Sequence, residues 1–315
     1  MNILLLGSTG MLGNEILEYV SLKTGEYPFS TIHQIPRTDM DRAIDMSKNS
    51  ISKTTLYNLL LNKVVNCGIT HVVNCIALTD TKAIETFPDA RAHSFLLNAQ
   101  FPGVLAEICK ELKLHLVHFS TDYVFSEYSE NDVCPITYYS DHKLMGELMV
   151  KNATDLYTII RVSWIYGTHR NKSFIHKFLI NCSQHMLNGE YEVMVVENQK
   201  SVPTSCDFVA KVAYEIMKNG LVGTFSISPQ PEDVSRAEFA NEILHVVGKW
   251  TDKFKNIKAR SIINSEVEPK HTVLGNHDKS NFITNEKYVT WQSDLWYYMA
   301  QHRAEFEKFI NSLPS

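Results

Sequence analysis

The chain has 315 residues, of which 44% are hydrophobic and 21% charged, so it can bury a large core and is neither fibrous nor intrinsically disordered. At roughly 150 residues per domain, this length predicts two domains, or one large domain with an added lobe. The net charge of -5 gives no positive field for a nucleic-acid backbone, which leaves small molecules and other proteins as the expected partners.

Strands and helices alternate along the first half of the chain. The apolar run of residues 2–6 ends at a glycine-rich turn, and apolar residues then recur at helical spacing as far as Val20. The same alternation predicts strands at residues 31–35, 71–74, 115–120 and 157–162, and helices within 54–65, 90–112 and 139–151. Strands joined by helices form βαβ units with right-handed crossovers. The predicted fold class is therefore α/β, a Rossmann-type doubly wound parallel sheet.

The pattern is less regular beyond about residue 165. It predicts helices at residues 174–186, 208–217 and 291–309, a helix capped by Ser235, and strands at 192–196 and 224–227. We assign residues 1–165 with 192–228 to an NAD(P)-binding Rossmann domain, and residues 166–191 with 229–315 to a smaller C-terminal lobe that binds the substrate.

Three glycines form a predicted phosphate-binding turn. Gly7, Gly10 and Gly13 have the spacing G-x-x-G-x-x-G and stand where a buried strand leads into a helix. In that context the first glycine permits the tight turn, the second lets the backbone approach a pyrophosphate, and the third allows the helix to pack closely on the sheet. The helix N-terminus then faces the negative charge of the ligand. The turn predicts dinucleotide binding, with an ordinary glycine turn as the alternative.

The end of the second strand predicts which dinucleotide is bound. A basic side chain there suits the 2′-phosphate of NADPH, and an acidic one suits the ribose of NAD. Arg37 follows this strand and favours NADPH, with NADH as the alternative cofactor and a solvated surface arginine as the structural alternative. Asp45 is a candidate for a bond to the adenine amino group, or else a carboxylate in a surface turn.

A tyrosine and a lysine four residues apart carry the predicted chemistry. Tyr139 and Lys143 share one face of a helix, and an ammonium beside a phenol favours the phenolate, which makes the tyrosine a usable proton donor and acceptor. Thr121 follows a buried strand and so emerges at the carboxyl end of the sheet, where its hydroxyl can polarise a substrate carbonyl. Asn98 could hold a water that links the lysine to solvent, or could simply be packed in its helix.

Several motifs together resemble the extended short-chain dehydrogenase/reductase superfamily. They are the glycine turn, Asn74-Cys75-Ile76-Ala77, Ser120-Thr121-Asp122-Tyr123-Val124-Phe125 and Tyr139-x-x-x-Lys143-Leu144-x-Gly146-Glu147. Within that superfamily the chain is most similar to the dTDP-4-dehydrorhamnose reductase family, and the likeness continues in order through nearly the whole chain. It includes Arg161 to Gly167, Asn171 to Phe174, Val195 to Thr204 and Ser235 to Ala240.

The resemblance implies NAD(P)H-dependent reduction of a 4-keto-6-deoxy sugar carried by a nucleoside diphosphate. It makes Thr121, Tyr139 and Lys143 the catalytic residues, with Tyr139 as proton donor and Lys143 on the nicotinamide ribose. The cofactor-binding residues that we assign are Gly7, Thr9, Gly10, Met11, Leu12, Gly13, Arg37, Asp45, Cys75, Ile76, Ala77, Asn98, Tyr139 and Lys143. The residues that we assign to substrate binding are Thr121, Asp122, Trp164 and Lys82, where Trp164 would lie beside the sugar unless it is a core aromatic.

The chain departs from the family pattern at three places. The segment Leu78-Thr79-Asp80-Thr81-Lys82-Ala83 differs from the family's usual Tyr-Thr-x-Val-Asp-Lys, which alters the wall beside the substrate. Pro269-Lys270-His271 stands where the family has an Arg-Pro pair. Epimerising relatives keep a cysteine where this chain has Asp122, which favours a reductase without epimerase activity. The nucleotide base and the exact sugar stay open.

Two other functions stay open beside the reductase. One is another nucleotide-sugar activity of the same superfamily, an epimerase or a dehydratase. The other is a non-catalytic, NADP-binding regulatory subunit, against which the complete set of Thr121, Tyr139 and Lys143 argues. The expected partner is the nucleotide sugar, with no nucleic acid and no membrane, and a homodimer is the candidate assembly.

The amino terminus and the cysteines predict a cytoplasmic protein. The apolar run of residues 3–6 is far shorter than the ~18 residues of a membrane helix, and it lacks the basic flank of a secretory signal. The 6 cysteines form no CxxC pair and have no histidines at zinc-ligand spacing. We therefore expect reduced thiols and no metal site.

Overall fold

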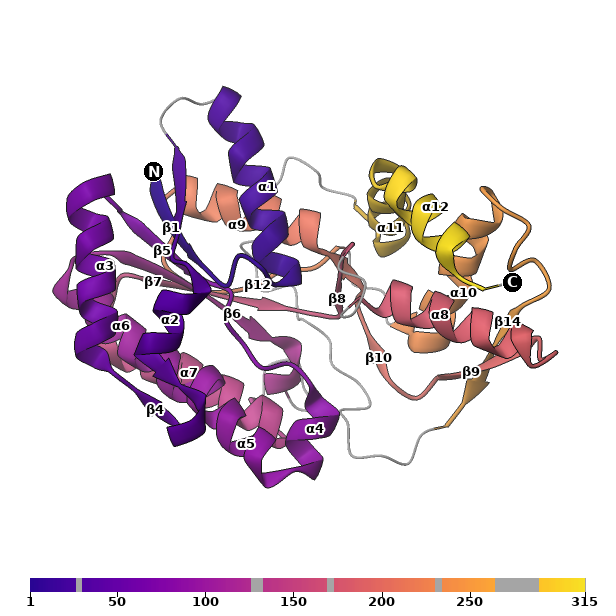
Figure 1. The fold of residues 1–315 in the computed structure, drawn as a ribbon, viewed down its shortest axis with the longest axis horizontal. Helices are drawn as coiled ribbons and strands as arrows, with labels where there is room; N and C mark the ends of the chain where they lie inside the picture. Colours follow the sequence, from indigo (N-terminus) through magenta and orange to yellow (C-terminus); the bar gives the residue numbers. More distant parts are fainter. Residues whose placement is uncertain (27–29, 126–132, 169–172, 230–233, 264–288, 315) are drawn as a thin grey trace.

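The computed structural model describes residues 1–26, 30–125, 133–168, 173–229, 234–263 and 289–314 (Figure 1). The motif residues Asn171 and Lys172 and the segment Pro269-Lys270-His271 lie outside these ranges. A sheet covered by helices forms one part of the molecule, and a smaller group of helices and strands forms the other (Figure 1). Among the described residues, no helix combines the length and the hydropathy that a bilayer crossing requires.

Six parallel strands form the central sheet, which confirms the predicted α/β Rossmann-type fold class. In spatial order they are β12 (Gly223–Ser226), β7 (Tyr157–Val162), β6 (His115–Thr121), β5 (His71–Asn74), β1 (Asn2–Leu6) and β2 (Thr31–Gln34). All seven residues of β6 are buried, as expected for an inner strand covered on both faces. The chain runs from β1 to the edge strand β2 and returns on the other side of β1 at β5. The carboxyl ends of β1 and β5 thus form the switch point at which such sheets bind ligands.

Helices cover both faces of this sheet (Figure 1). Helices α1 (Met11–Glu26) and α9 (Cys206–Lys218) lie on one face, and α3 (Lys53–Cys67), α6 (Phe101–Glu111) and α7 (Tyr138–Ala153) lie on the other. The core under α1 includes Leu12, Ile16 and Val20, the residues whose helical spacing predicted this helix. Each face therefore has its own apolar core.

The smaller lobe has a separate core. Its helices are α8 (Phe174–Leu187), α10 (Arg236–Gly248), α11 (Trp291–Gln301) and α12 (Arg303–Ser312), and its strands are β9 (Glu192–Val196) and β14 (Lys258–Ile262). The assignment of residues 192–196 to the Rossmann domain is wrong, because β9 pairs with β14 and its Val193 and Val195 belong to the lobe core. An alternating strand fits either sheet, so its pattern alone could not place it. The rest of the domain division remains our proposal.

Two short strand pairs connect the sheet to the lobe. β8 (Ile165–Tyr166) pairs with β11 (Thr204–Ser205), and β10 (Lys200–Ser201) pairs with β13 (Val234–Ser235). Asp294 of α11 accepts hydrogen bonds from the backbone N–H and the hydroxyl of Ser205, each at 2.7 Å, and from the hydroxyl of Tyr166 at 2.9 Å. These three donors satisfy the buried carboxylate, so α11 is fixed to the strands that leave the central sheet.

Some elements differ from the prediction. The helix predicted within residues 90–112 is α5 (Pro88–Ser94), a π-helical turn (Phe95–Gln100) and then α6. Pro102 stands at the start of α6 and has no N–H to donate to the preceding turn, which the wider π-helical turn accommodates. The closing helix is two helices, α11 and α12. The short elements that periodicity does not detect are α2 (Arg37–Ala43), β3 (Ile44–Asp45), β4 (Ser50–Ile51), α4 (Thr81–Thr86) and the 3₁₀ turns Met46–Lys48 and Asp122–Val124.

Candidate active site

Three glycines shape the turn between β1 and α1. Gly7 has a φ of +80°, a backbone conformation that residues with a Cβ rarely adopt. Its carbonyl accepts a hydrogen bond from the N–H of Gly10 at 3.0 Å. A Cβ on Gly13 would lie 2.2 Å from the carbonyl oxygen of Gly7, so the first turn of α1 packs directly on the loop. Helix α1 begins directly after this turn, and the free N–H groups of a helix N-terminus favour the binding of phosphate. Thr9 is exposed in the turn.

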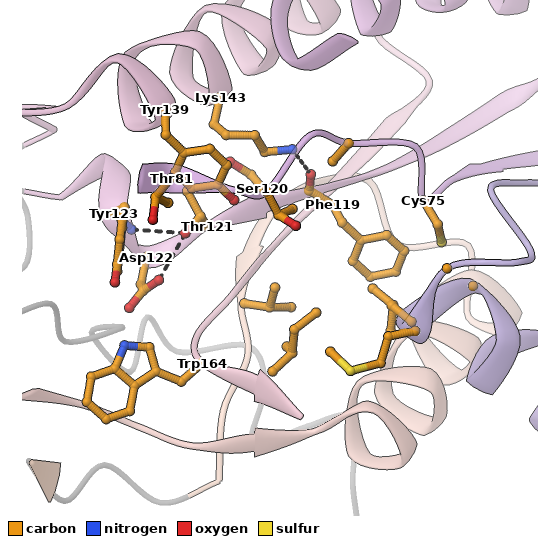
Figure 2. Close-up of a pocket in the computed structure, with 18 of the residues that line it drawn as sticks. Cys75, Thr81, Phe119, Ser120, Thr121, Asp122, Tyr123, Tyr139, Lys143 and Trp164 are labelled. Carbon is orange, nitrogen blue, oxygen red and sulfur yellow. Dashed lines mark hydrogen bonds between the residues drawn. The ribbon is translucent and has the colours of Figure 1, made fainter. Parts of the chain in front are cut away.

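A cavity of about 400 Å³ lies beside this turn (Figure 2). Gly10, Met11, Leu12 and Gly13 form one wall of it, and the residues at the carboxyl ends of β5 and β6 form another. The start of α7 and the lobe helices α8 and α10 complete it. The cavity therefore lies at the switch point of the sheet, between the sheet and the lobe. Among the described residues, no group of three or more His, Cys, Asp or Glu side chains could hold a metal ion.

The loop after β5 lines the cavity with Cys75, Ile76 and Ala77. Asn98 holds this loop from behind: its Oδ1 accepts from the N–H of Leu78 at 3.0 Å, and its Nδ2 donates to the carbonyl of Leu78 at 2.8 Å. Asn98 is fully buried and does not line the cavity. The side chain of Asn98 thus anchors the loop, and its predicted roles toward a water and the cofactor stay predictions.

Thr121, Tyr139 and Lys143 come together in the cavity (Figure 2). Thr121 ends β6, and the other two lie one turn apart in α7. Two contacts fix the start of α7: Thr137 caps the helix, and a carboxylate oxygen of Glu85 in α4 accepts from the N–H of Tyr139 at 3.2 Å. Nothing in the sequence pattern pointed to Glu85, because the contact joins two helices that are far apart in the chain.

Burial governs the protonation of the pair. It raises the pKa of Tyr139, and the negative charge of Asp122 raises it further. Burial also lowers the pKa of Lys143 to about 8. The Nζ of Lys143 donates to the backbone carbonyl of Phe119 at 2.6 Å. The expected lowering of the tyrosine pKa by the lysine is thus not what the structure shows: the phenol keeps its proton and can donate it.

Asp122 lines the cavity, but protein hydroxyls engage its carboxylate. Its Oδ1 accepts from the hydroxyl of Thr121 at 3.0 Å, and its Oδ2 accepts from Ser163 at 3.0 Å and from Ser201 at 2.7 Å. The residue is only 1% exposed. Its predicted contact with the substrate stays a prediction, and the sequence analysis missed the contacts from Ser163 and Ser201.

An aromatic and two cations form the lobe side of the cavity. Trp164 lines it and has a φ of +35°, a backbone conformation that residues with side chains rarely adopt. The guanidinium of Arg236, the first residue of α10, lies 3.6 Å from the centroid of the Trp164 ring. Lys177 of α8 also lines the cavity. The sequence analysis did not single out either cation, although the cap at Ser235 places Arg236 at a helix start.

Asp45 and Lys82 lie outside the cavity. Asp45 caps the turn that follows it, and its hydrogen bonds with Ser47 and Lys48 lower its pKa to about 2. The contacts of Asp45 are therefore those of the alternative interpretation, a carboxylate in a surface turn. Lys82 is exposed on α4, whereas its neighbour Thr81 faces the cavity (Figure 2). A one-residue shift along a helix turns a side chain by about 100°, which explains the difference.

Arg37 begins α2 and is also outside the cavity. Its side chain is 85% exposed, and its Nε lies 3.8 Å from a carboxylate oxygen of Asp41. It nevertheless stands just beyond β2, which ends at Gln34 and carries the position that reads the adenosine ribose in this fold. Its role in the choice of NADPH remains a proposal.

We expect Arg37→Ala to weaken NADPH binding by about tenfold or more and to leave NADH binding within about twofold, because only NADPH has a phosphate for the guanidinium. Titration of both cofactors measures this. Arg42→Ala, an exposed arginine on the same helix that pairs with Asp39, is the matched control. Equal effects on both cofactors would remove Arg37 from the site.

The fold and the cavity define a class of protein. A Rossmann-type sheet, a glycine turn at its switch point and a Tyr-x-x-x-Lys helix beside it are the combination found in extended short-chain dehydrogenases/reductases. The family model described as the RmlD substrate binding domain matches residues 1–304, and the chain belongs to that family.

Curated relatives and solved structures agree with this assignment. The chain is 28% identical over 282 residues to the dTDP-4-keto-6-deoxy-D-glucose reductase of Streptomyces niveus, covering 87% of this chain and 88% of that protein. It is 27% identical over 258 residues to the probable low-salt glycan biosynthesis reductase Agl14 of Haloferax volcanii, covering 77% and 79%. The crystal structure of a dTDP-4-dehydrorhamnose reductase from Clostridium acetobutylicum has the same fold, with a TM-score of 0.77 and 24% identity over 96% of this chain and 100% of that one.

Proposed function

We propose that this chain is an NAD(P)H-dependent reductase of a 4-keto-6-deoxy sugar carried on a nucleoside diphosphate, acting in deoxysugar nucleotide biosynthesis. The observation that carries the proposal is the cavity, which brings the glycine turn together with Thr121, Tyr139 and Lys143. Its lobe side is formed by Trp164, Lys177 and Arg236, which we call the lobe wall. The curated relatives include nucleotide-sugar ketoreductases, and the chain is an oxidoreductase of the same family.

The residues present fit a dinucleotide. A Cβ built on Gly10 has only the Gly7 carbonyl oxygen within 4 Å, at 3.3 Å, so the turn presents bare backbone beside the N-terminus of α1. Gly10, Met11 and Leu12 would hold the pyrophosphate, and Lys143 would hold the nicotinamide ribose. Bound NADPH supplies the hydride that the keto carbon receives.

Residues of the chain donate a proton to the keto oxygen and stabilise the negative charge that develops on it. Tyr139 donates its phenol proton to the keto oxygen, because burial keeps that proton in place until the substrate arrives. Thr121 donates a hydrogen bond to the same oxygen and stabilises the negative charge that develops on it. The ammonium of Lys143 then stabilises the phenolate that Tyr139 becomes.

The lobe wall suits the rest of the substrate. Arg236 and Lys177 can bind the oxygens of a diphosphate, and a guanidinium does so with two parallel hydrogen bonds. Trp164, held under Arg236, offers a flat apolar face to the sugar. We therefore place the diphosphate at the lobe and the keto group at Tyr139.

The function is tested by following NADPH oxidation with dTDP-, UDP- and GDP-linked 4-keto-6-deoxy sugars. We expect oxidation of one NADPH per sugar with at least one nucleotide, and none with the corresponding 4-hydroxy sugars. NADPH binding without oxidation by any member of the panel would contradict the proposal and favour the regulatory-subunit alternative.

A second test separates the reductase from an epimerase. Asp122 has no thiol and its carboxylate is held by hydroxyls, so we expect no base that removes a sugar C–H proton at this place. During turnover in deuterated water with an unepimerised 4-keto-6-deoxy sugar, the product should carry no solvent deuterium at C3 or C5. Mass spectrometry and NMR measure this, and deuterium at either carbon would contradict a pure reductase.

We also propose that the protein works as a cytoplasmic homodimer. All 6 cysteines are free, which suits a reducing compartment. The outer face of α7 exposes Met145, Leu148 and Met149, each 40–49% exposed, and such an apolar face suits pairing with a second copy. Sedimentation equilibrium tests the assembly, and the mass of a single chain at micromolar concentration would contradict it.

A further inference from the structure

A buried carboxylate links the proposed catalytic threonine to the lobe. The two oxygens of Asp122 accept hydrogen bonds from hydroxyls on three separate segments: Thr121 in β6, Ser163 after β7 and Ser201 in β10. The hydroxyls of Ser163 and Ser201 also contact each other. An anion that is removed from water needs such donors, so one charge holds three segments together.

The first contact sets the direction of the Thr121 hydroxyl. A threonine hydroxyl has a single proton, and here it points to Oδ1 of Asp122 at 3.0 Å (Figure 2). The oxygen of Thr121 accepts from the N–H of Tyr123 at 3.2 Å. When the substrate binds, this proton turns from Oδ1 to the keto oxygen. Asp122 therefore fixes where the Thr121 hydroxyl lies before the substrate arrives.

The second contact reaches the cationic wall. In the pairing of β10 with β13, Ser201 lies opposite Val234, and Lys200 lies opposite Ser235. Ser235 caps α10, so the next residue, Arg236, begins that helix over the Trp164 ring. The hydrogen bond from Ser201 to Asp122, at 2.7 Å, thus joins the end of β6 to β10. The partner of β10 is β13, which leads directly into α10 and Arg236.

We propose that Asp122 is a positioning residue. It orients the Thr121 hydroxyl and, through Ser201, holds the end of β6 beside the part of the lobe that carries Arg236. The proposal rests on the proposed reductase function. The same negative charge raises the pKa of Tyr139 and so helps to keep the proton donor protonated.

Two variants separate these effects. Asp122→Asn keeps the size and removes the charge, so we expect kcat to fall by about 10- to 100-fold, the size of a hydrogen bond to a charged group. The KM for the nucleotide sugar should rise as well, because the hydroxyl of Ser201 loses its charged acceptor. Ser201→Ala keeps the charge and the contact with Thr121, so its effect should appear mainly as a rise of about threefold or more in the KM for the nucleotide sugar, with a smaller change in kcat.

Both variants with wild-type kcat and KM, and only a lower Tm, would overturn the proposal, because Asp122 would then be merely structural. A wild-type protein that reduces none of the sugars would refute the reductase function instead. In that case a thermal-unfolding cycle of Asp122→Asn, Ser201→Ala and the double variant decides the link between strand and lobe. A coupling between the two losses supports the link, and losses that simply add overturn it.

Discussion

Replacing Tyr139 with phenylalanine should lower kcat by roughly 10²- to 10⁴-fold, the usual loss for a general acid, while folding and NADPH binding are retained. The variant removes only the phenol oxygen. It keeps the ring, which packs edge-to-face on Tyr123 with centroids 6.2 Å apart. Steady-state kinetics on the reducible nucleotide sugar and a fluorescence titration of NADPH measure the two quantities separately.

Tyr138→Phe is the matched control for this prediction. Tyr138 is the preceding residue, is 45% exposed, and carries the guanidinium of Arg91 3.6 Å above its ring, outside the cavity. Its loss of a hydroxyl should leave kcat within about twofold. Unchanged turnover in Tyr139→Phe would mean that the tyrosine and lysine merely share a helix face.

Glu15 should make the protein less stable as the pH rises from about 4.5 to 7. This residue of α1 is 7% exposed and accepts a hydrogen bond from the hydroxyl of Tyr298 in α11 at 3.2 Å. Burial, with the nearby charge of Asp207, raises its pKa from 4.5 to about 7. Because the folded protein binds this proton more tightly than the unfolded chain does, the stabilisation is complete below pH 4.5 and is lost by about pH 7. The loss amounts to up to about 3 kcal/mol.

Glu15→Gln tests this, because an amide of the same shape does not ionise. The Tm of the variant should rise relative to that of the wild type as the pH increases through this range. Glu18→Gln removes the same charge from the exposed side of α1, where Glu18 accepts from Asn14, and serves as the control. A constant Tm difference between Glu15→Gln and the wild type across the range would show that folding does not shift the pKa of Glu15.

The features that the sequence predicted are those with a local physical cause. The glycine turn, the strand–helix alternation and the placing of Tyr139 and Lys143 on one helix face follow from spacing alone, and the structure confirms the fold class. The motifs also identified the family correctly. The roles of the individual site residues stay predictions.

The features that the sequence could not predict depend on contacts between distant segments. The partner of β9 is β14, and a half-buried strand carries no mark of which sheet it joins. The contacts of Ser163 and Ser201 with the Asp122 carboxylate have no local signal either, because the three residues are far apart in the chain. The hydrogen bond from the N–H of Tyr139 to the carboxylate of Glu85 is a further contact of this kind.

The return of the chain from the lobe to the central sheet has a consequence for folding during synthesis. The edge strand β12 and the covering helix α9 come from residues 206–226, after β8, α8 and β9 have been made. Until α9 has left the ribosome, α1 is the one helix of the described residues that covers this face of the sheet. The nascent Rossmann part thus stays incomplete until residues 206–226 have been made, and exposed apolar surface of this kind is what chaperones protect.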